Sequence, residues 1–145
     1  MRLIETHINI AAPAGTVWQA LTDFPSYARD NWNEYIRSIA APLVRGGRVT
    51  AVTHTPRLGQ RDLKATLVNV DLPELSWEVK LPVPGLLHAT HYFRAEALSP
   101  ASTRFVQGER VSGVLTGLVF HLVEKSEAGF HTMNEALKRR AEGRR

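Results

Sequence analysis

Two polar side chains lie where the sequence predicts the inward face of a β-strand. In the stretch TRFVQGERVSG, residues 103–113, Phe105 and Val111 share one face because strand side chains alternate with a period of two. Gln107 and Glu109 lie on that same face between them. A carboxylate and an amide that leave water need hydrogen-bonding partners, because burying them unpaired is unfavourable. What these groups can do depends on whether the face meets a packed core, a cavity or open water.

The preceding strand supplies a histidine that Glu109 could contact. In LLHATHYFRA, residues 86–95, His91 lies on the face that otherwise carries apolar side chains. If a three-residue loop joins the two strands, His91 lies opposite Glu109 and Phe93 lies opposite Gln107. A register shifted by two residues would instead place Phe93 opposite Glu109. In both registers the three polar groups share the inward face.

The pairing of His91 with Glu109 has a chemical and a structural interpretation. A carboxylate can orient an imidazole ring, which then serves as a general base or acid, so these two are the candidate catalytic residues. Structurally, the same groups would be the polar lining of a wet cavity or a satisfied buried ion pair. A histidine and a glutamate can also hold a metal ion, but no third ligand lies at a useful spacing. His88 falls on the opposite face, and His7, His121 and His131 read as surface residues. We therefore expect no metal and no cofactor.

The elements around this pair follow from hydrophobic periodicity and turn residues. Residues 2–11 alternate as a strand with isoleucines on one face. Pro13 suits the first turn of a short helix, and Pro25 interrupts this helix before a second short helix or a turn. After Trp32 the chain becomes strands separated by short turns, which predicts an antiparallel meander and excludes a parallel sheet.

Two irregularities are expected inside the meander. A tight hairpin is predicted at residues 45–48, where two glycines permit positive φ. Residues 61–72 change their apolar face partway along, so a β-bulge near Leu67 would restore one inward face and bend the sheet. The alternative is that both faces of this strand are covered.

From Val114 onward the apolar period becomes that of a helix. One long amphipathic helix is predicted, with Gly129 on or beside its apolar stripe, where a glycine indicates a bend or a close packing contact. A sheet with one apolar face needs a cover, and this helix supplies it, leaving a wedge of space as the natural ligand site. The expected stripe is Leu115, Leu118, Val119, Leu122, Ser126, Phe130, Met133 and Leu137.

Composition sets the broad class of the protein. A chain of 145 residues with 43% hydrophobic content is predicted to form one domain, residues 1–145. It has no cysteine and no apolar run long enough to cross a bilayer, so we expect no stable membrane insertion. These features favour a cytoplasmic protein of bacterial type. We expect it to be a monomer or a homodimer. The net charge of +4 comes from the closing stretch, where cations suit a helix C-terminus, so we expect no nucleic-acid partner. Those cations are Lys138, Arg139, Arg140, Arg144 and Arg145.

Nearly the whole chain resembles the START-like, Bet v 1-like superfamily (SRPBCC), and within it the bacterial polyketide cyclase/dehydrase and lipid transport branch. The resemblance is carried by INIAAPAGTVWQALTDFPSYARDNWNEYIRSI, by HYFRAEAL with GERVSGVL, and by GFHTMNEALKRRAE. The Trp32-Asn33 pair matches the family pattern, although Glu34 stands where a proline is expected. The resemblance implies an α+β helix-grip fold: a curved antiparallel sheet of about seven strands around a long C-terminal helix, with two short helices after the first strand.

The resemblance also implies a mainly apolar cavity and three functions. The first is binding of a hydrophobic or amphipathic small molecule, lipid- or polyketide-like. The second is a polyketide cyclase or dehydratase that uses His91 and Glu109 as its acid–base pair, and the third is an interaction module for quinone-lipid or translation partners. The residues expected to line the cavity are Trp77, Val79, Leu81, Ala89, His91, Phe93, Phe105, Gln107, Glu109, Leu122, Phe130 and Met133, with Tyr27, Trp32 and Tyr35 at its mouth.

Overall fold

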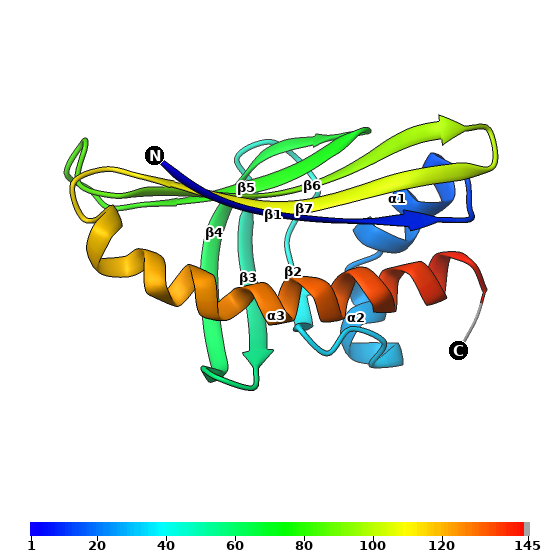
Figure 1. The fold of residues 1–145 in the computed structure, drawn as a ribbon, viewed down its shortest axis with the longest axis horizontal. Helices are drawn as coiled ribbons and strands as arrows, with labels where there is room; N and C mark the ends of the chain where they lie inside the picture. Colours follow the sequence, from blue (N-terminus) through cyan, green and yellow to red (C-terminus); the bar gives the residue numbers. More distant parts are fainter. Residues whose placement is uncertain (144–145) are drawn as a thin grey trace.

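One curved antiparallel sheet wraps around a long C-terminal helix in the computed structural model, which describes residues 1–143 (Figure 1). The seven strands are ordered β1-β7-β6-β5-β4-β3-β2. This is the predicted helix-grip architecture. The elements are β1 (Arg2–Ile10), α1 (Ala14–Thr22), α2 (Pro25–Asp30), β2 (Ile36–Ala40), β3 (Arg48–Thr55), β4 (Gly59–Asp71), β5 (Glu74–Lys80), β6 (His88–Ser99), β7 (Ser102–Ser112) and α3 (Thr116–Ala141).

The register between β6 and β7 confirms one of the two predicted pairings. His91 lies opposite Glu109 and Phe93 lies opposite Gln107. The connection differs slightly from the expected three-residue loop, because the register slips after Ala97 and Ser99 pairs with Ser102. His91, Gln107 and Glu109 therefore share the inward face.

The predicted β-bulge in β4 is present. The pairing of β4 with β5 shifts between Leu67 and Asn69. A bulge increases the local twist and bends the strand. Accordingly, β2, β3 and the first part of β4 run across the direction of β1, β6 and β7, so that the sheet curls around α3 (Figure 1).

The expected tight hairpin at residues 45–48 was wrong. β2 ends at Ala40 and β3 begins at Arg48, so a longer connection joins them. Pro42, two residues after the end of β2, has no N–H to donate to a strand ladder. The Gly46 N–H donates instead to the carbonyl of Leu67 at 2.9 Å, with Gly46 at φ +80°.

The short helices begin as expected and lead into β2. α1 follows Pro13, α2 starts at Pro25, and Asn31 ends α2 in the left-handed conformation at φ 48°. The buried Asn33 then caps the start of β2, because its Oδ1 accepts hydrogen bonds from the N–H groups of Tyr35 and Ile36 at 3.0 and 2.9 Å. This gives the Trp32-Asn33 pair of the sequence a structural role.

α3 packs against the sheet, but the first part of its predicted stripe was wrong. Phe130, Met133 and Leu137 are fully buried, as expected. In the first turns the inward positions are Phe120 and Val123, whereas Leu118 is 70% exposed. The apolar stripe is wider than the buried face, so periodicity alone does not fix the rotation of the helix.

Of the two roles expected for Gly129, a bend or a close packing contact, the structure shows the packing contact. A Cβ atom at this position would lie 2.3 Å from the Tyr35 ring. The glycine therefore lets Tyr35 pack directly on α3.

Within residues 1–143 no helix is long and apolar enough to cross a bilayer. Arg144 and Arg145 of the basic tail lie outside the described residues.

Candidate functional site

A cavity of about 220 Å³ lies between the sheet and the first half of α3. Its inner wall carries His91 on β6 and Glu109 on β7. Four further residues that were predicted to line the cavity do so, namely Trp77, Val79, Ala89 and Leu122. Tyr35, which was predicted at the cavity mouth, also lines the cavity.

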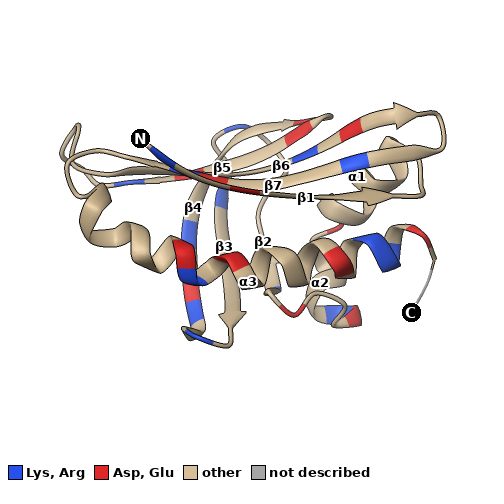
Figure 2. Ribbon diagram, in the orientation of Figure 1, with Lys and Arg blue, Asp and Glu red and all other residues tan. Residues whose placement is uncertain are grey.

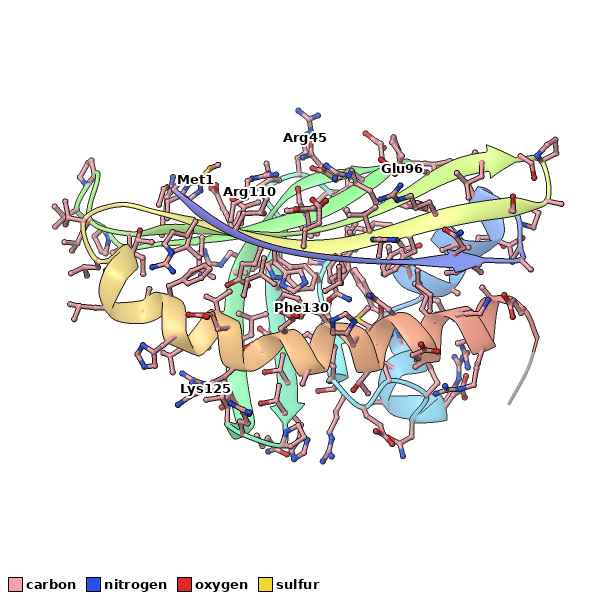
Figure 3. The ribbon with its side chains drawn as sticks, viewed as in Figure 1. Met1, Arg45, Glu96, Arg110, Lys125 and Phe130 are labelled. Carbon is pink, nitrogen blue, oxygen red and sulfur yellow. The ribbon has the colours of Figure 1, made fainter. Side chains whose placement is uncertain are left out.

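The other predicted lining residues lie elsewhere. Phe93, Phe105, Gln107, Phe130 and Met133 are fully buried in the core behind the cavity wall. Phe130 extends from α3 toward the sheet (Figure 3). Leu81 was predicted to line the cavity, but it follows the end of β5 and is 37% exposed at the surface.

Two of the three residues predicted at the cavity mouth also lie elsewhere. Tyr27 is buried, and its hydroxyl donates to the carbonyl of Leu21 at 2.5 Å. Trp32 packs edge-to-face on Tyr27 and donates from Nε1 to the hydroxyl of Ser26 at 3.0 Å. Neither lines the cavity: Tyr27 lies in α2, and Trp32 borders the surface where α1, α2 and α3 meet.

Aromatic rings hold the His91 imidazole in place. Trp77, directly opposite on β5, stacks on it with ring centroids 5.5 Å apart. Phe130 packs edge-to-face at 4.9 Å, and the Phe93 ring lies at 4.6 Å. These rings leave the imidazole nearly buried, with its nitrogens directed at polar partners.

A buried hydrogen-bond network continues from His91 into the core. Nε2 of His91 lies 2.9 Å from Oε1 of Gln107. The Gln107 amide nitrogen donates to Oδ1 of Asn134 at 2.8 Å and to the Phe130 carbonyl at 3.3 Å. Asn134 in turn donates to the Thr6 hydroxyl at 2.8 Å, which donates to the backbone carbonyl of Gln107 at 3.0 Å.

This network fixes which imidazole nitrogen carries a proton. A carbonyl can only accept, so the Thr6 hydroxyl uses its proton on the backbone of Gln107 and must accept from the Asn134 amide nitrogen. Asn134 therefore presents its oxygen to Gln107, and Gln107 presents its oxygen to His91. The Phe130 carbonyl independently requires the same orientation of the Gln107 amide. His91 Nε2 is consequently a donor, and Nδ1 is the nitrogen that faces Glu109.

Nδ1 of His91 faces Glu109, whose Oε1 lies 3.3 Å away. An unprotonated Nδ1 and a carboxylate are both acceptors, so the contact is a hydrogen bond only when one proton lies between them. The contact is longer than a strong charge-assisted hydrogen bond, which leaves both groups able to bind a third polar atom. Glu109 is half-buried and lines the cavity, so that atom can come from a bound molecule.

Tyr35 provides a second polar group beside the pair. Burial raises the pKa of its hydroxyl far above the usual range, and the negative charge of Glu109 raises this pKa further. The phenol therefore stays protonated and is a neutral neighbour of the carboxylate. Its ring also packs on Phe130 at 5.6 Å, which anchors it to α3.

The rim of the cavity comes from residues that the sequence did not single out. They belong to β2, to the β3–β4 hairpin and to α3, and they mix apolar with polar and charged groups. They are Ile36, Thr53, Leu58, Arg61, Asp62, Leu63, Val123 and Ser126. Arg61 and Asp62 are exposed, so this side, between the hairpin and α3, is where the cavity opens.

Thr6 and Asn134 are the functional residues that sequence reasoning missed. Both gave the signal that identified Gln107, a polar side chain on an inward face. Thr6 lies on the same strand face as the isoleucines of β1, and Asn134 comes one helical turn after Phe130. Within residues 1–143 no three histidine, aspartate or glutamate side chains gather where they could hold a metal ion.

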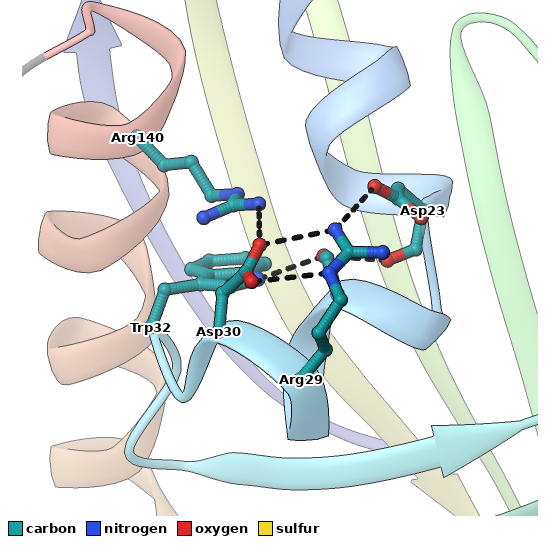
Figure 4. Close-up of polar contacts among 6 residues, drawn as sticks. Asp23, Arg29, Asp30, Trp32 and Arg140 are labelled. Carbon is teal, nitrogen blue, oxygen red and sulfur yellow. Dashed lines mark hydrogen bonds and ion pairs between the residues drawn. The ribbon is translucent and has the colours of Figure 1, made fainter.

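A second hollow, of about 850 Å³, lies on the surface where α1, α2 and α3 meet. An ion-pair cluster stands at its edge (Figure 4). Arg140 contacts Asp30 at 2.7 Å, and Arg29 contacts the same carboxylate at 3.0 Å. Hydrogen bonds from Arg29 and then Arg140 lower the pKa of Asp30 to about 2. The cluster is satisfied within itself, so this larger hollow has less reactive chemistry than the cavity.

Comparisons with known proteins agree with this geometry. The family model for polyketide cyclase / dehydrase and lipid transport matches residues 1–142. No curated protein matches the sequence significantly. Among solved structures, the Zhui aromatase/cyclase from Streptomyces sp. R1128 superposes with a TM-score of 0.71 at 19% identity, covering 97% of this chain and 93% of that chain.

Two further structures show the same likeness. A START superfamily protein from Mycobacterium smegmatis gives a TM-score of 0.69 at 17% identity, covering 97% of each chain. A truncated norcoclaurine synthase from Thalictrum flavum gives 0.67 at 13% identity, covering 95% of this chain and 91% of that chain. At these identities the likeness shows the fold. With the family match over nearly the whole length, it establishes that the chain belongs to the polyketide cyclase / dehydrase and lipid transport family of START-like proteins.

Proposed function

We propose that the protein binds a compact amphipathic molecule, lipid- or polyketide-like, in the cavity between the sheet and α3. The observation that carries this proposal is the joint exposure of His91 and Glu109 to a cavity bordered by Trp77, Val79 and Leu122. An apolar pocket with a few convergent polar groups is the usual form of a small-molecule site. The ligand's rings would contact the apolar wall, and its polar group would bind the pair.

The volume of the cavity limits the size of the ligand. At about 220 Å³ it is smaller than the roughly 300–1,000 Å³ of drug-sized pockets. A molecule of one or two rings is therefore favoured over a fully enclosed long acyl chain. The polar rim formed by Arg61 and Asp62 would leave a hydrophilic end of the ligand in water.

A second candidate function is acid–base catalysis of dehydration or cyclisation. The network from Thr6 to Gln107 favours it, because a fixed proton on His91 Nε2 makes the Nδ1–Glu109 contact the proton-exchanging part of the site. In a dehydration, the pair would give its proton to a leaving hydroxyl group and take up the proton released from the adjacent carbon. Water leaves, a carbon–carbon double bond forms, and the pair regains its proton.

Tryptophan fluorescence tests the binding proposal. The chain has three tryptophans, and replacing Trp18 and Trp32 by Phe leaves Trp77, which borders the cavity, as the only reporter. Naphthol, a two-ring phenol, should quench Trp77 saturably at one molecule per chain. Ala89→Leu, which fills the cavity, should weaken this binding about tenfold or more, the loss expected from steric exclusion of a ring.

A matched control variant shows whether the loss of binding is specific to the cavity. Thr90→Leu introduces the same side chain on the opposite face of β6 and should leave naphthol binding unchanged. Equal affinity in the Ala89→Leu and Thr90→Leu proteins would refute the cavity as the binding site.

Turnover is tested separately with 3-hydroxy-1-tetralone, which forms naphthol when it loses water. His91→Asn and Glu109→Gln should abolish any naphthol production while naphthol still binds. If the native protein produces no naphthol faster than buffer does, catalysis of this reaction is excluded and the binding proposal remains.

A further inference from the structure

Two loops meet at one end of the sheet and expose apolar side chains there. The Val114 N–H donates to the carbonyl of Gly85 at 3.0 Å, and the Leu115 N–H donates to the carbonyl of Leu86 at 3.0 Å. These bonds join the β5–β6 loop to the connection between β7 and α3. We call their exposed side chains the apolar tip: Leu81, Val83, Val114 and Leu118.

The exposure of the apolar tip is a fixed feature of the backbone. Val114, Leu118 and Val83 are 80%, 70% and 58% exposed, large fractions for apolar side chains that lie close together. Prolines at both sides of Val83 restrict that loop. Gly113, at φ +106°, approaches the loop so closely that a Cβ atom there would lie 2.6 Å from the Leu86 carbonyl. The two loops therefore hold each other in place and cannot fold these side chains inward.

The charges around the apolar tip are predominantly positive. The segments 79–95 and 110–123, which contain both loops and the first turns of α3, have no aspartate or glutamate (Figure 2). Lys80 precedes Leu81 and has a largely exposed side chain. The Arg2 guanidinium lies 4.2 Å from the centre of the Phe120 ring, beside the start of α3. The acidic Glu78 on β5 lies 2.8 Å from His88 and 3.8 Å from the Lys80 ammonium group, so it offsets part of the positive charge at this end of the sheet.

We propose that the apolar tip docks reversibly on an anionic phospholipid bilayer. Exposed aliphatic side chains would enter the interfacial layer, while Lys80 and Arg2 would contact anionic headgroups, the combination that peripheral membrane binding requires. Docking would bring the cavity close to the bilayer, because Leu118 of the tip lies one helical turn before Leu122 of the cavity wall. This inference goes beyond ligand binding and stands on a separate surface.

Charge complementarity favours a lipid surface over a second copy of the chain. In a symmetric dimer through the apolar tip, each copy would present the same patch to its partner, so Lys80 and Arg2 would face like charges. An anionic bilayer instead presents the opposite charge to every cation of the tip.

Vesicle co-sedimentation tests the proposal on the full chain. The native protein should bind saturably to vesicles of phosphatidylcholine mixed with phosphatidylglycerol, and the bound fraction should fall as salt is raised. Binding to pure phosphatidylcholine should be far weaker. The double variant Val114→Asp/Leu118→Asp should reduce partitioning onto the mixed vesicles by about tenfold or more, since it places charges on the inserted surface.

Control variants change the same residue types away from the apolar tip. Leu98, in the β6–β7 hairpin, is 56% exposed, and Leu98→Asp should leave vesicle binding unchanged. Lys80→Gln should weaken binding to the mixed vesicles, whereas Arg139→Gln, on the exposed last turn of α3, should not. If the double variant unfolds at lower temperature than the native protein, Val114→Ser/Leu118→Gln replaces it and should show the same direction of effect.

Three results would overturn the docking proposal. They are equal binding to neutral and mixed vesicles, equal loss in the Leu98→Asp control, and self-association in sedimentation velocity that the double variant abolishes. The last would assign the apolar tip to a second copy of the chain. Naphthol binding by the double variant should match that of the native protein, so failure of docking and failure of the cavity proposal are distinguished.

Discussion

Two polar clusters in this molecule have similar geometry and opposite surroundings. The ion pair of Asp30 with Arg140 is 2.7 Å long, and the hydrogen bond of Gln107 to Asn134 is 2.8 Å long. Gln107 and Asn134 are almost fully buried, whereas Asp30 and Arg140 stay partly in water. Distance alone therefore does not measure what a polar contact contributes, since water can replace a lost partner only at the surface.

The same contrast separates the two hollows. The surface hollow beside Asp30 is the larger, about 850 Å³ against about 220 Å³, but the ion pair of Asp30 with Arg140 at its edge is partly solvated. In the cavity, His91 and Glu109 face each other at 3.3 Å in partly dry surroundings, where electrostatic interactions are stronger. The smaller hollow is accordingly the better candidate for a functional site.

The largest effect is expected from removing the centre of the buried network. Gln107→Leu leaves the Nε2–H group of His91 and the Oδ1 atom of Asn134 without partners in the core. The free energy of unfolding should fall by about 2–4 kcal/mol, because each unsatisfied buried group carries its full desolvation penalty. Urea unfolding of the native and variant proteins measures this loss.

The control for Gln107→Leu is a leucine on the exposed face of the same strand. Arg104→Leu on β7 should change the free energy of unfolding by no more than about 0.5 kcal/mol. If both leucine variants are equally stable, the network does not stabilise the fold, and the contrast between buried and exposed polar clusters fails.

A smaller loss is expected from the far end of the network. In Asn134→Leu, the Gln107 amide nitrogen keeps the Phe130 carbonyl as its acceptor, so the free energy of unfolding should fall by about 1–2 kcal/mol. The same remaining contact should preserve the orientation of the Gln107 amide. Nitrogen-15 spectra should therefore show His91 Nε2 protonated in both the native and the Asn134→Leu proteins.

Comparison with Gln107→Leu completes this test of the imidazole. Without the amide oxygen nothing holds the proton on Nε2, and the spectra should show a mixture of tautomers. The His91→Asn protein identifies which of the six histidine signals belongs to His91. A native His91 with an unprotonated Nε2 would show that the Gln107 amide has the opposite orientation.

The elements and the centre of the site were predictable because local patterns determine them. Period-two alternation placed the polar groups of both strands on one face and left two registers open, of which the structure has the one with His91 opposite Glu109. The change of face near Leu67 indicated the bulge. The polar residues on inward faces were visible wherever that face was known. Thr6 and Asn134 could have been found by the same rule.

The rest depended on how distant segments pack against each other. The short helices gave no clear phase, so Tyr27 was expected at the cavity mouth although it is buried between α1 and α2. The rotation of α3 was set by Phe120 packing on Val111, which left Leu118 exposed. Arg61 and Asp62 reach the cavity because the sheet curls, a property of the whole meander that no local pattern shows.

The smallest effect is expected at the surface ion pairs. Asp30→Asn removes the charge that Arg29 and Arg140 contact, but water solvates both guanidinium groups afterwards. Near neutral pH the free energy of unfolding should therefore differ from that of the native protein by less than in either network variant.

The pH dependence of this difference has a defined sign. The pKa of Asp30 falls from the ordinary value of 3.8 to about 2 in the folded protein, so the charged carboxylate stabilises the fold above about pH 4. This contribution is lost as the pH falls through about 2, when the carboxylate becomes protonated in the folded state as well. The stability difference between native and Asp30→Asn proteins, measured by urea unfolding, should thus be constant from pH 7 to about pH 5 and shrink below about pH 4. A difference that grows on acidification would mean that Asp30 is better stabilised when protonated, contrary to its contacts with two arginines.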